Sequence, residues 1–196
     1  MSKNDRQPIL IYLWALSDPP LSSADRIRAC VRSYAEAAGM EEAETLRAAS
    51  PVIAKGARGK PYFPDLPGLH FSLAHSGVYG ACAVHGAPVG LDLQIHNESA
   101  REAIARRFFH PEEYAYLKAH DFTPFFGVWA AKESYVKYTG EGIAGALTAF
   151  AVADEHGLKA NMGDVMLYHC APRENYSLCL CAREIPGVRL IAPGSI

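Results

Sequence analysis

The sequence predicts an α+β protein with two similar halves, each made of an antiparallel meander of strands together with helices. Two observations predict this class. Short runs rich in branched and aromatic residues, separated by turn-forming residues, occur in both parts of the chain, and capped helical patterns lie beside them. The chain has 196 residues and is 49% hydrophobic, so it can bury a core of this kind. We expect halves at 1–97 and 98–196 in a pseudo-two-fold arrangement, with a ligand site in the crevice between them.

The first half begins with a predicted buried strand over residues 9–16. A helix follows over residues 24–38, with Ser22 or Ser23 as its cap and Gly39 at its end. Beyond this helix, alternating runs separated by short turns predict an antiparallel meander with strands at 71–75, 79–84 and 89–95.

The second half begins with helices and ends with strands. Cap and first-turn residues predict helices from Ser99 to about Phe109, from Pro111 to Ala119, and from Thr123-Pro124 to about Tyr138. The pattern then returns to strands, which we expect at 147–153, 165–171 and 177–183 as a second meander.

Composition excludes several functional classes. The 19 basic and 21 acidic residues give a formal charge of −2. We therefore do not expect the protein to bind nucleic acid along its whole surface. The apolar run at 9–16 is too short to cross a membrane, and no signal-peptide pattern follows Met1. Five scattered cysteines without a Cys-x-x-Cys pair favour neither disulfides nor zinc, and we expect a cytoplasmic protein.

One candidate site residue is a carboxylate within a predicted strand. Alternation over residues 89–94 places Leu91 and Leu93 on one face and Asp92 and Gln94 on the other. Strand interiors disfavour Asp, so Asp92 is either a solvent-facing residue of an edge strand or part of a site.

A second candidate lies on the best-supported helix of the chain. Glu133 and Lys137 are four residues apart and share a helix face, with Trp129 one turn earlier. Such a pair is usually a surface ion pair, but this helix is apolar around much of its circumference. Charges on a largely buried helix require partners, which favours a functional site.

A third candidate combines a loop with the end of a strand. Gly59-Lys60-Pro61 places an ammonium on a constrained loop, while His75-Ser76 offers a ring donor and a hydroxyl. These groups suit phosphate oxygens, although a lone His at a strand end is more often structural.

Taken together, these motifs resemble the 4′-phosphopantetheinyl transferase superfamily. Its hallmark is (V/I)-G-(V/I/L)-D followed at a distance by (F/W)-x-x-K-E-(S/A)-x-x-K, and Asp92 and Glu133 are 41 residues apart here. The matching segments are Gly59-Lys60-Pro61, Phe71 to Ser76, Gly90-Leu91-Asp92 and Trp129 to Lys137. The resemblance, to the two-half, monomeric Sfp type, implies the fold of that family and runs from about residue 26 to 152.

The resemblance implies a metal site. In the family, the Asp and Glu of these motifs hold Mg²⁺ against the pyrophosphate of coenzyme A, which here implies Asp92 and Glu133. Gln94 stands where relatives often carry a further acid, and its neutral carbonyl oxygen remains a possible ligand, directly or through water. The resemblance also implies that Lys137 and Lys132 lie at the pyrophosphate.

Further residues are implied for the adenosine side of coenzyme A. Lys60 and His75 match residues that contact its phosphates, with His75 at the 3′-phosphate and Ser76 beside it. An early helix arginine reaches the same phosphate in the family; we expect Arg26 in that role, with Arg28 as the alternative.

The implied reaction transfers 4′-phosphopantetheine from coenzyme A to a serine of an apo acyl or peptidyl carrier protein, releasing adenosine 3′,5′-bisphosphate. Glu133 is the favoured catalytic base, directly or through water, beside catalytic Asp92 and Lys137. The basic and apolar segment 106–109 is either the docking surface for the carrier or an ordinary helix end that packs two phenylalanines and leaves its arginines in solvent. Two alternatives stay open: a non-catalytic relative that binds coenzyme A, and a Mg²⁺-dependent phosphodiesterase.

Overall fold

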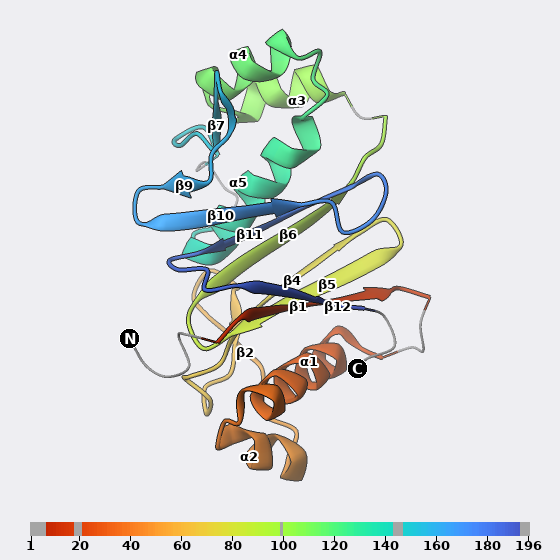
Figure 1. Cartoon of the computed structure of the whole chain (residues 1–196), viewed down its shortest axis with the longest axis vertical. Coiled ribbons are helices and arrows are strands. Elements are labelled where there is room, and N and C mark those ends of the chain that lie inside the picture. Colours follow the sequence, from red (N-terminus) through yellow and green to blue (C-terminus); the bar gives the residue numbers. More distant parts are fainter. Residues whose placement is uncertain (1–6, 18–20, 99, 143–146, 193–196) are drawn as a thin grey trace.

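The computed structural model describes residues 7–17, 21–98, 100–142 and 147–192, which form four stacked layers (Figure 1). Two four-stranded sheets lie face to face in the middle. Their strand orders are β12-β1-β5-β4 and β6-β11-β10-β9. Helices cover the two outer faces, so each sheet is buried on both sides. The predicted α+β class is confirmed.

The first sheet consists of β1 (Ile9–Ala15), β4 (His70–Ser76), β5 (Tyr79–His85) and β12 (Val188–Ile191). The second consists of β6 (Val89–Ile95), β9 (Asn161–Met162), β10 (Val165–Cys170) and β11 (Tyr176–Ala182). Two small hairpins pair β2 (Ala54–Lys55) with β3 (Pro61–Tyr62) and β7 (Ala153–Asp154) with β8 (Gly157–Leu158). The β2–β3 hairpin lies beside the site described below.

The outer layers are helical. On the first sheet lie α1 (Ser23–Ala38) and α2 (Glu42–Ala48). Against the second sheet packs α5 (Phe125–Thr139), with α3 (Arg101–Phe108) and α4 (Pro111–Ala119) beyond it. The predicted caps of α1 are confirmed, because the Ser22 hydroxyl accepts from the Asp25 amide at 3.1 Å and Gly39 ends the helix with φ 64°.

Strict alternation in β1 separates two hydrophobic cores. Ile9, Ile11 and Leu13 point toward the second sheet, while Leu10, Tyr12 and Trp14 point toward α1. The core between the sheets also takes Leu91 and Leu93 of β6. The predicted assignment of these two leucines to one face, with Asp92 on the other, is therefore confirmed.

The third strand of the predicted first meander lies elsewhere. β6 pairs with β11 of the second sheet rather than with β5, and β12 returns to pair in parallel with β1. Two hydroxyls connect β4 to β6 instead of a backbone ladder: Ser72 Oγ accepts from Leu91 N, and Ser76 Oγ from Ile95 N, both at 2.9 Å. The prediction of a three-stranded meander at 71–95 was wrong, because β6 is an edge strand of the second sheet and pairs with β11 instead of β5. The boundary at 97/98 and the pseudo-two-fold relation stay predictions.

Two further local predictions were wrong. Residues 147–152 form no strand, because the Phe150 carbonyl and the Val152 amide bond to the side chains of Lys132 and Glu113 instead of a neighbouring strand. The N-cap of α5 is Pro124 and no side chain caps this helix, so Thr123 does not have the predicted role. The predicted cap Ser99 lies outside the described residues.

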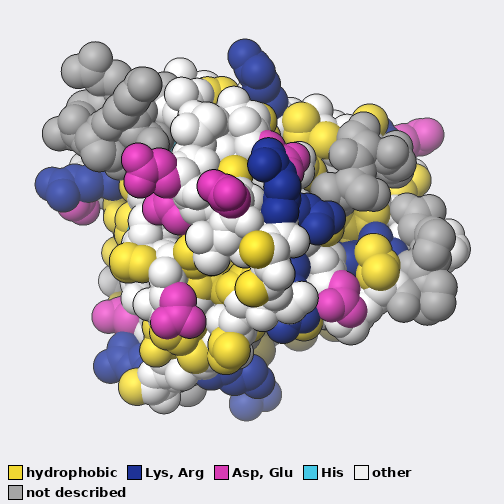
Figure 2. All heavy atoms as spheres, turned by 90° about the horizontal axis from the view of Figure 1, so that it is seen from below, with side chains coloured by type: hydrophobic (Ala, Val, Ile, Leu, Met, Phe, Trp, Pro, Cys, Tyr) yellow, Lys and Arg dark blue, Asp and Glu magenta, His cyan; other side chains and the backbone are white. Residues whose placement is uncertain are grey.

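The surface over the first helical layer carries both signs of charge. Figure 2 shows Lys and Arg interspersed with Asp and Glu on this face, without a field of one sign among the residues described. Among all the residues that the structure describes, no helix is both long enough and apolar enough to cross a membrane.

Candidate active site

The candidate site forms where α5 packs on β6. Gly90 permits this close approach: a Cβ at this position would overlap the Ser134 carbonyl oxygen and the Tyr138 amide of α5. Two residues further along β6, Asp92 faces the same helix, which presents Glu133 and Lys137. The sequence thus brings both motifs of the resemblance together through one strand–helix contact.

Asp92 is buried and held by two hydrogen bonds. The Lys137 ammonium donates to Oδ1 at 2.6 Å, and the Gln94 amide nitrogen donates to Oδ2 at 2.7 Å. Burial raises the pKa of Asp92, while the Lys137 charge opposes that rise. The burial of Asp92 contradicts the alternative of a solvent-facing side chain, although β6 is an edge strand of its sheet.

Glu133 lies beside this pair and is only 7% exposed. Its carboxylate accepts no hydrogen bond from any described residue. Burial raises the pKa of Glu133, and the neighbouring charge of Asp92 raises it further. Two buried carboxylates facing one ammonium form an acid pair that is only partly neutralised, which is the electrostatic condition for attracting a cation.

Glu133 and Lys137 open onto a cavity of about 230 Å³. Its walls come from the loop before β3, from β4 and from α5, so segments far apart in sequence enclose it. The lining includes Gly59, Lys60, Ser72, Leu73, Glu133 and Lys137. The cavity lies between residues 58–73 and 133–142. That the active site occupies a crevice between the two predicted halves stays a prediction.

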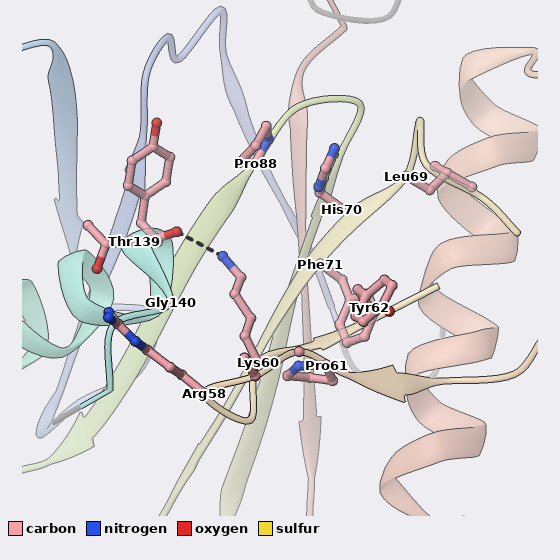
Figure 3. Close-up of a pocket in the computed structure, with 13 residues that line it drawn as sticks. Arg58, Lys60, Pro61, Tyr62, Leu69, His70, Phe71, Pro88, Thr139 and Gly140 are labelled. Atoms are coloured by element: carbon pink, nitrogen blue, oxygen red, sulfur yellow. Dashed lines mark hydrogen bonds between the residues drawn. The ribbon is translucent and has the colours of Figure 1, made fainter. Parts of the chain in front are cut away.

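Lys60 forms part of the wall between this cavity and a larger one of about 550 Å³. Figure 3 shows Lys60 extending to the end of α5, where its ammonium donates to the Tyr138 carbonyl at 2.9 Å; it also reaches the Val89 carbonyl at 3.4 Å. Burial lowers the pKa of Lys60. In this structure Lys60 fastens the β2–β3 loop to α5, and it borders the cavity where a phosphate contact is predicted.

His75 and Arg26 line a separate small cavity of about 100 Å³, together with Trp14. The Arg26 guanidinium stacks over the Trp14 ring at 5.3 Å. Arg28 turns away, donating to Asp25 at 3.0 Å and to the Pro51 carbonyl at 3.1 Å. Of the two arginines that the sequence left open, the geometry favours Arg26.

Ser76 has a structural contact in this structure. Its hydroxyl accepts from the Ile95 amide, which connects the end of β4 to the end of β6. The hydroxyl proton remains available for donation, so the bond does not exclude the predicted contact with a phosphate.

Lys132 does not lie at the site, which corrects the prediction that it contacts coenzyme A. Its ammonium is 1% exposed and donates to both carboxylate oxygens of Glu113, at 2.7 and 2.9 Å, and to the Phe150 carbonyl at 2.8 Å. All three of its donors are therefore used on the side of α5 that faces α4. Lys132 is a structural residue.

Sequence reasoning missed Glu113, the 0% exposed partner of Lys132. Its carboxylate also accepts from the His110 and Val152 amides, at 2.9 and 2.7 Å. The acid at the third helical position after His110 is a recognisable cap signal, and the structure shows this capping box. Its burial depends on tertiary contacts that the spacing does not reveal.

The residues present fit a magnesium ion. Asp92, Glu133 and Gln94 supply oxygen donors, which Mg²⁺ prefers. Among the described residues no group of three or more His, Cys, Asp or Glu side chains is arranged to hold a metal, so the remaining ligands would be water and substrate oxygens. A pair of carboxylates completed by phosphate is the usual way in which proteins bind this ion.

Comparison with known proteins agrees with this geometry. Residues 88–181, which contain Asp92, Glu133 and Lys137, match the 4′-phosphopantetheinyl transferase superfamily. The matched segment covers just under half of the chain, and the resemblance inferred from the motifs is confirmed.

The particular relatives are of the Sfp type. The chain is 35% identical over 136 residues to a 4′-phosphopantetheinyl transferase of Bacillus subtilis, covering 63% of this chain and 59% of the relative. It is 40% identical over 98 residues to 4′-phosphopantetheinyl transferase Sfp of Bacillus subtilis strain 168, covering 48% and 43%. It is 41% identical over 96 residues to 4′-phosphopantetheinyl transferase HetI of Nostoc, covering 44% and 40%. The chain thus spans about half the length of the curated relatives it matches.

Proposed function

We propose that this protein transfers 4′-phosphopantetheine from coenzyme A to a serine of an apo acyl or peptidyl carrier protein, as a holo-[carrier-protein] synthase. The observation that carries the proposal is that Glu133 and Lys137 line one cavity, while the buried Asp92 lies beside them and accepts a hydrogen bond from Lys137. Residues of the superfamily segment supply all three groups. The reaction needs a divalent cation and phosphate contacts, which this arrangement suits.

Asp92 and Glu133 would hold Mg²⁺, with Gln94 contributing its carbonyl oxygen directly or through water. When bound, the ion would neutralise charge on the pyrophosphate and on the departing adenosine bisphosphate. The raised pKa of Glu133, caused by burial and by Asp92, supports this role because a cation would relieve the repulsion between the two carboxylates.

The basic groups would fix the substrate. Lys137 lies 2.6 Å from Asp92, where a pyrophosphate bound through a cation would come within its reach. Arg26 and His75 would receive the 3′-phosphate in their small cavity, and Lys60 would face the phosphates from the opposite wall. Catalysis would then depend mainly on positioning and electrostatics.

The proton balance assigns a role to Glu133. The carrier serine oxygen attacks the pantetheine-side phosphorus, a new P–O bond forms, and the bond to adenosine 3′,5′-bisphosphate breaks. The serine proton passes to Glu133, directly or through water. Because a metal-bound carboxylate is a poor base, this role needs a Glu133 oxygen that the cation leaves free.

The carrier would dock beside α3. Arg106 and Arg107 are exposed there, and Phe108 is 38% exposed, whereas Phe109 is buried against Phe125 and Trp129. The expected patch is therefore reduced to residues 106–108, and Phe109 belongs to the core. Its two arginines suit an acidic helix of the carrier. We propose that the protein acts as a monomer, without nucleic acid.

Intact-mass measurement of apo carrier proteins tests the proposal. The protein is incubated with coenzyme A, Mg²⁺ and each carrier, alongside Glu133→Gln and samples without metal. The expected result is a mass gain of one phosphopantetheine that disappears in both controls. Transfer that persists without the Glu133 carboxylate would contradict the proposed site, and coenzyme A binding without transfer to any carrier would favour a non-catalytic relative.

A further inference from the structure

The turn between β4 and β5 lies next to His75 and is short. Ser76 pairs with Tyr79 across it, and His75 pairs with Gly80, so Gly77 and Val78 alone connect the strands. The position of the His75 ring in its cavity therefore depends on how this turn is held.

A tyrosine from the opposite sheet holds the turn. The Tyr176 hydroxyl, on β11, accepts from the Val78 amide at 3.2 Å and donates to the Ser76 carbonyl at 3.2 Å. The Tyr176 side chain is buried, and its ring meets that of Tyr79 edge-on at 5.3 Å. One phenol thus satisfies backbone groups on both sides of Gly77 and fixes the turn against the second sheet.

Gly77 makes this contact possible. Its φ is 55°, and a Cβ at this position would lie 2.5 Å from the Tyr176 hydroxyl oxygen and 2.7 Å from Ile95 Cδ1. A side chain at Gly77 would therefore displace the phenol from the turn. The glycine, the phenol and the Ser76–Ile95 bond form one connection between the end of β4 and the second sheet.

We propose that Tyr176 is a positioning residue, which holds the β4–β5 turn so that His75 and Arg26 enclose the 3′-phosphate of an adenine nucleotide. The inference rests on the proposed function for the identity of that nucleotide. Tyr176 does not line the small cavity, so it acts through His75 rather than by touching the ligand. Tyr176, on the C-terminal strand β11, would thus contribute to the specificity of a phosphate site whose contacting residues come from β4 and α1.

The proposal predicts a selective effect of Tyr176→Phe. This variant keeps the ring and removes only the two bonds of the hydroxyl, while Ser76 still connects the turn to Ile95. Each neutral hydrogen bond contributes roughly a factor of 2 to 10, so we expect about 5- to 10-fold weaker binding of adenosine 3′,5′-bisphosphate. Binding of adenosine 5′-monophosphate, which lacks the 3′-phosphate, should change less than about 2-fold.

Calorimetric titration of both nucleotides into the wild type, Tyr176→Phe and Tyr168→Phe measures this selectivity. Tyr168, on the neighbouring strand β10, is a matched control because its hydroxyl makes no hydrogen bond to any described residue. Equal losses for both nucleotides, or no loss for either, would overturn the inference, as would a wild type that does not prefer the 3′-phosphorylated nucleotide. A selective loss in a protein that fails to modify any carrier would support the inference while refuting the proposed transferase reaction.

Discussion

Two buried carboxylates, Asp92 and Glu133, share a single ammonium, that of Lys137. Most proteins avoid such a concentration of negative charge because the charged form loses its hydration on burial. At a site that binds a cation, the same uncompensated negative charge attracts the ion. The conflict between stability and function at these residues can be measured.

Glu133→Gln should stabilise the protein without ligand at neutral pH. Because the pKa of Glu133 is raised in the folded protein, the folded state binds the proton more tightly than the unfolded state. Wild-type stability therefore falls as pH rises from the ordinary pKa of glutamate to the raised one, and then levels off. The variant should gain about 1 kcal/mol, or about 2–4 °C in Tm, above the raised pKa. The gain should vanish as the pH falls to the ordinary pKa.

Thermal unfolding of both proteins across this pH range checks the expectation. Glu112→Gln is the matched control, because Glu112 is an exposed glutamate of α4. An unchanged or lower Tm for Glu133→Gln at neutral pH would show that the Glu133 charge is already compensated.

Substitutions in the buried ion pair of Lys132 and Glu113 should instead destabilise the protein. Removing one partner leaves an unpaired buried charge, so Lys132→Met and Glu113→Gln should each cost about 3–5 kcal/mol. The double variant should cost clearly less than the sum, since neither charge is then left alone. Denaturant unfolding of the four proteins measures the coupling, and additive losses would contradict the described network.

At the scale of elements, the contact between α5 and β6 decides the geometry of the site. Gly90 lies against the backbone of the helix without space for a side chain. The same contact sets how far Asp92 lies from Glu133 and Lys137, so a small shift of the strand would disturb the acid pair.

Gly90→Ala should therefore lower both stability and activity. The added methyl group forces β6 away from α5, and we expect a loss of about 2–3 kcal/mol together with at least about 10-fold lower transfer. Gly68→Ala is the control, because a Cβ there meets only the Glu42 side chain at 3.5 Å. Chemical denaturation and the carrier assay measure the two effects, and wild-type values for Gly90→Ala would show that the contact is not tight.

Local signals predicted the elements that depend on local chemistry. The caps of α1 and the alternation in β6 both follow from short-range patterns. The patterns missed α2, the short hairpin strands and β12, whose pairing partner β1 lies at the other end of the chain. Residues 147–152 were wrongly predicted as a strand. Alternation cannot reveal that the side chains of Lys132 and Glu113 form hydrogen bonds with the backbone of this segment.

At the scale of the whole molecule, the site joins segments that the motifs identified separately. Glu133, Lys137 and Lys60 line one cavity, with Asp92 bonded to Lys137, and His75 and Arg26 line another. The motif resemblance grouped these residues, but it could not separate Lys132, whose position one residue from Glu133 turns it to a different side of α5. It also gave no sign of Tyr176, because the tertiary fold alone brings β11 to the turn beside His75.

We propose that Asp92 and Glu133 together bind coenzyme A with a divalent cation. The most direct test is a calorimetric titration of coenzyme A, with and without Mg²⁺, into the wild type, Asp92→Asn and Glu133→Gln. We predict that Mg²⁺ strengthens binding to the wild type by at least about 10-fold and that either substitution removes most of this gain. Wild-type affinity that does not respond to Mg²⁺, or a full Mg²⁺ effect that survives in both variants, would contradict the claim.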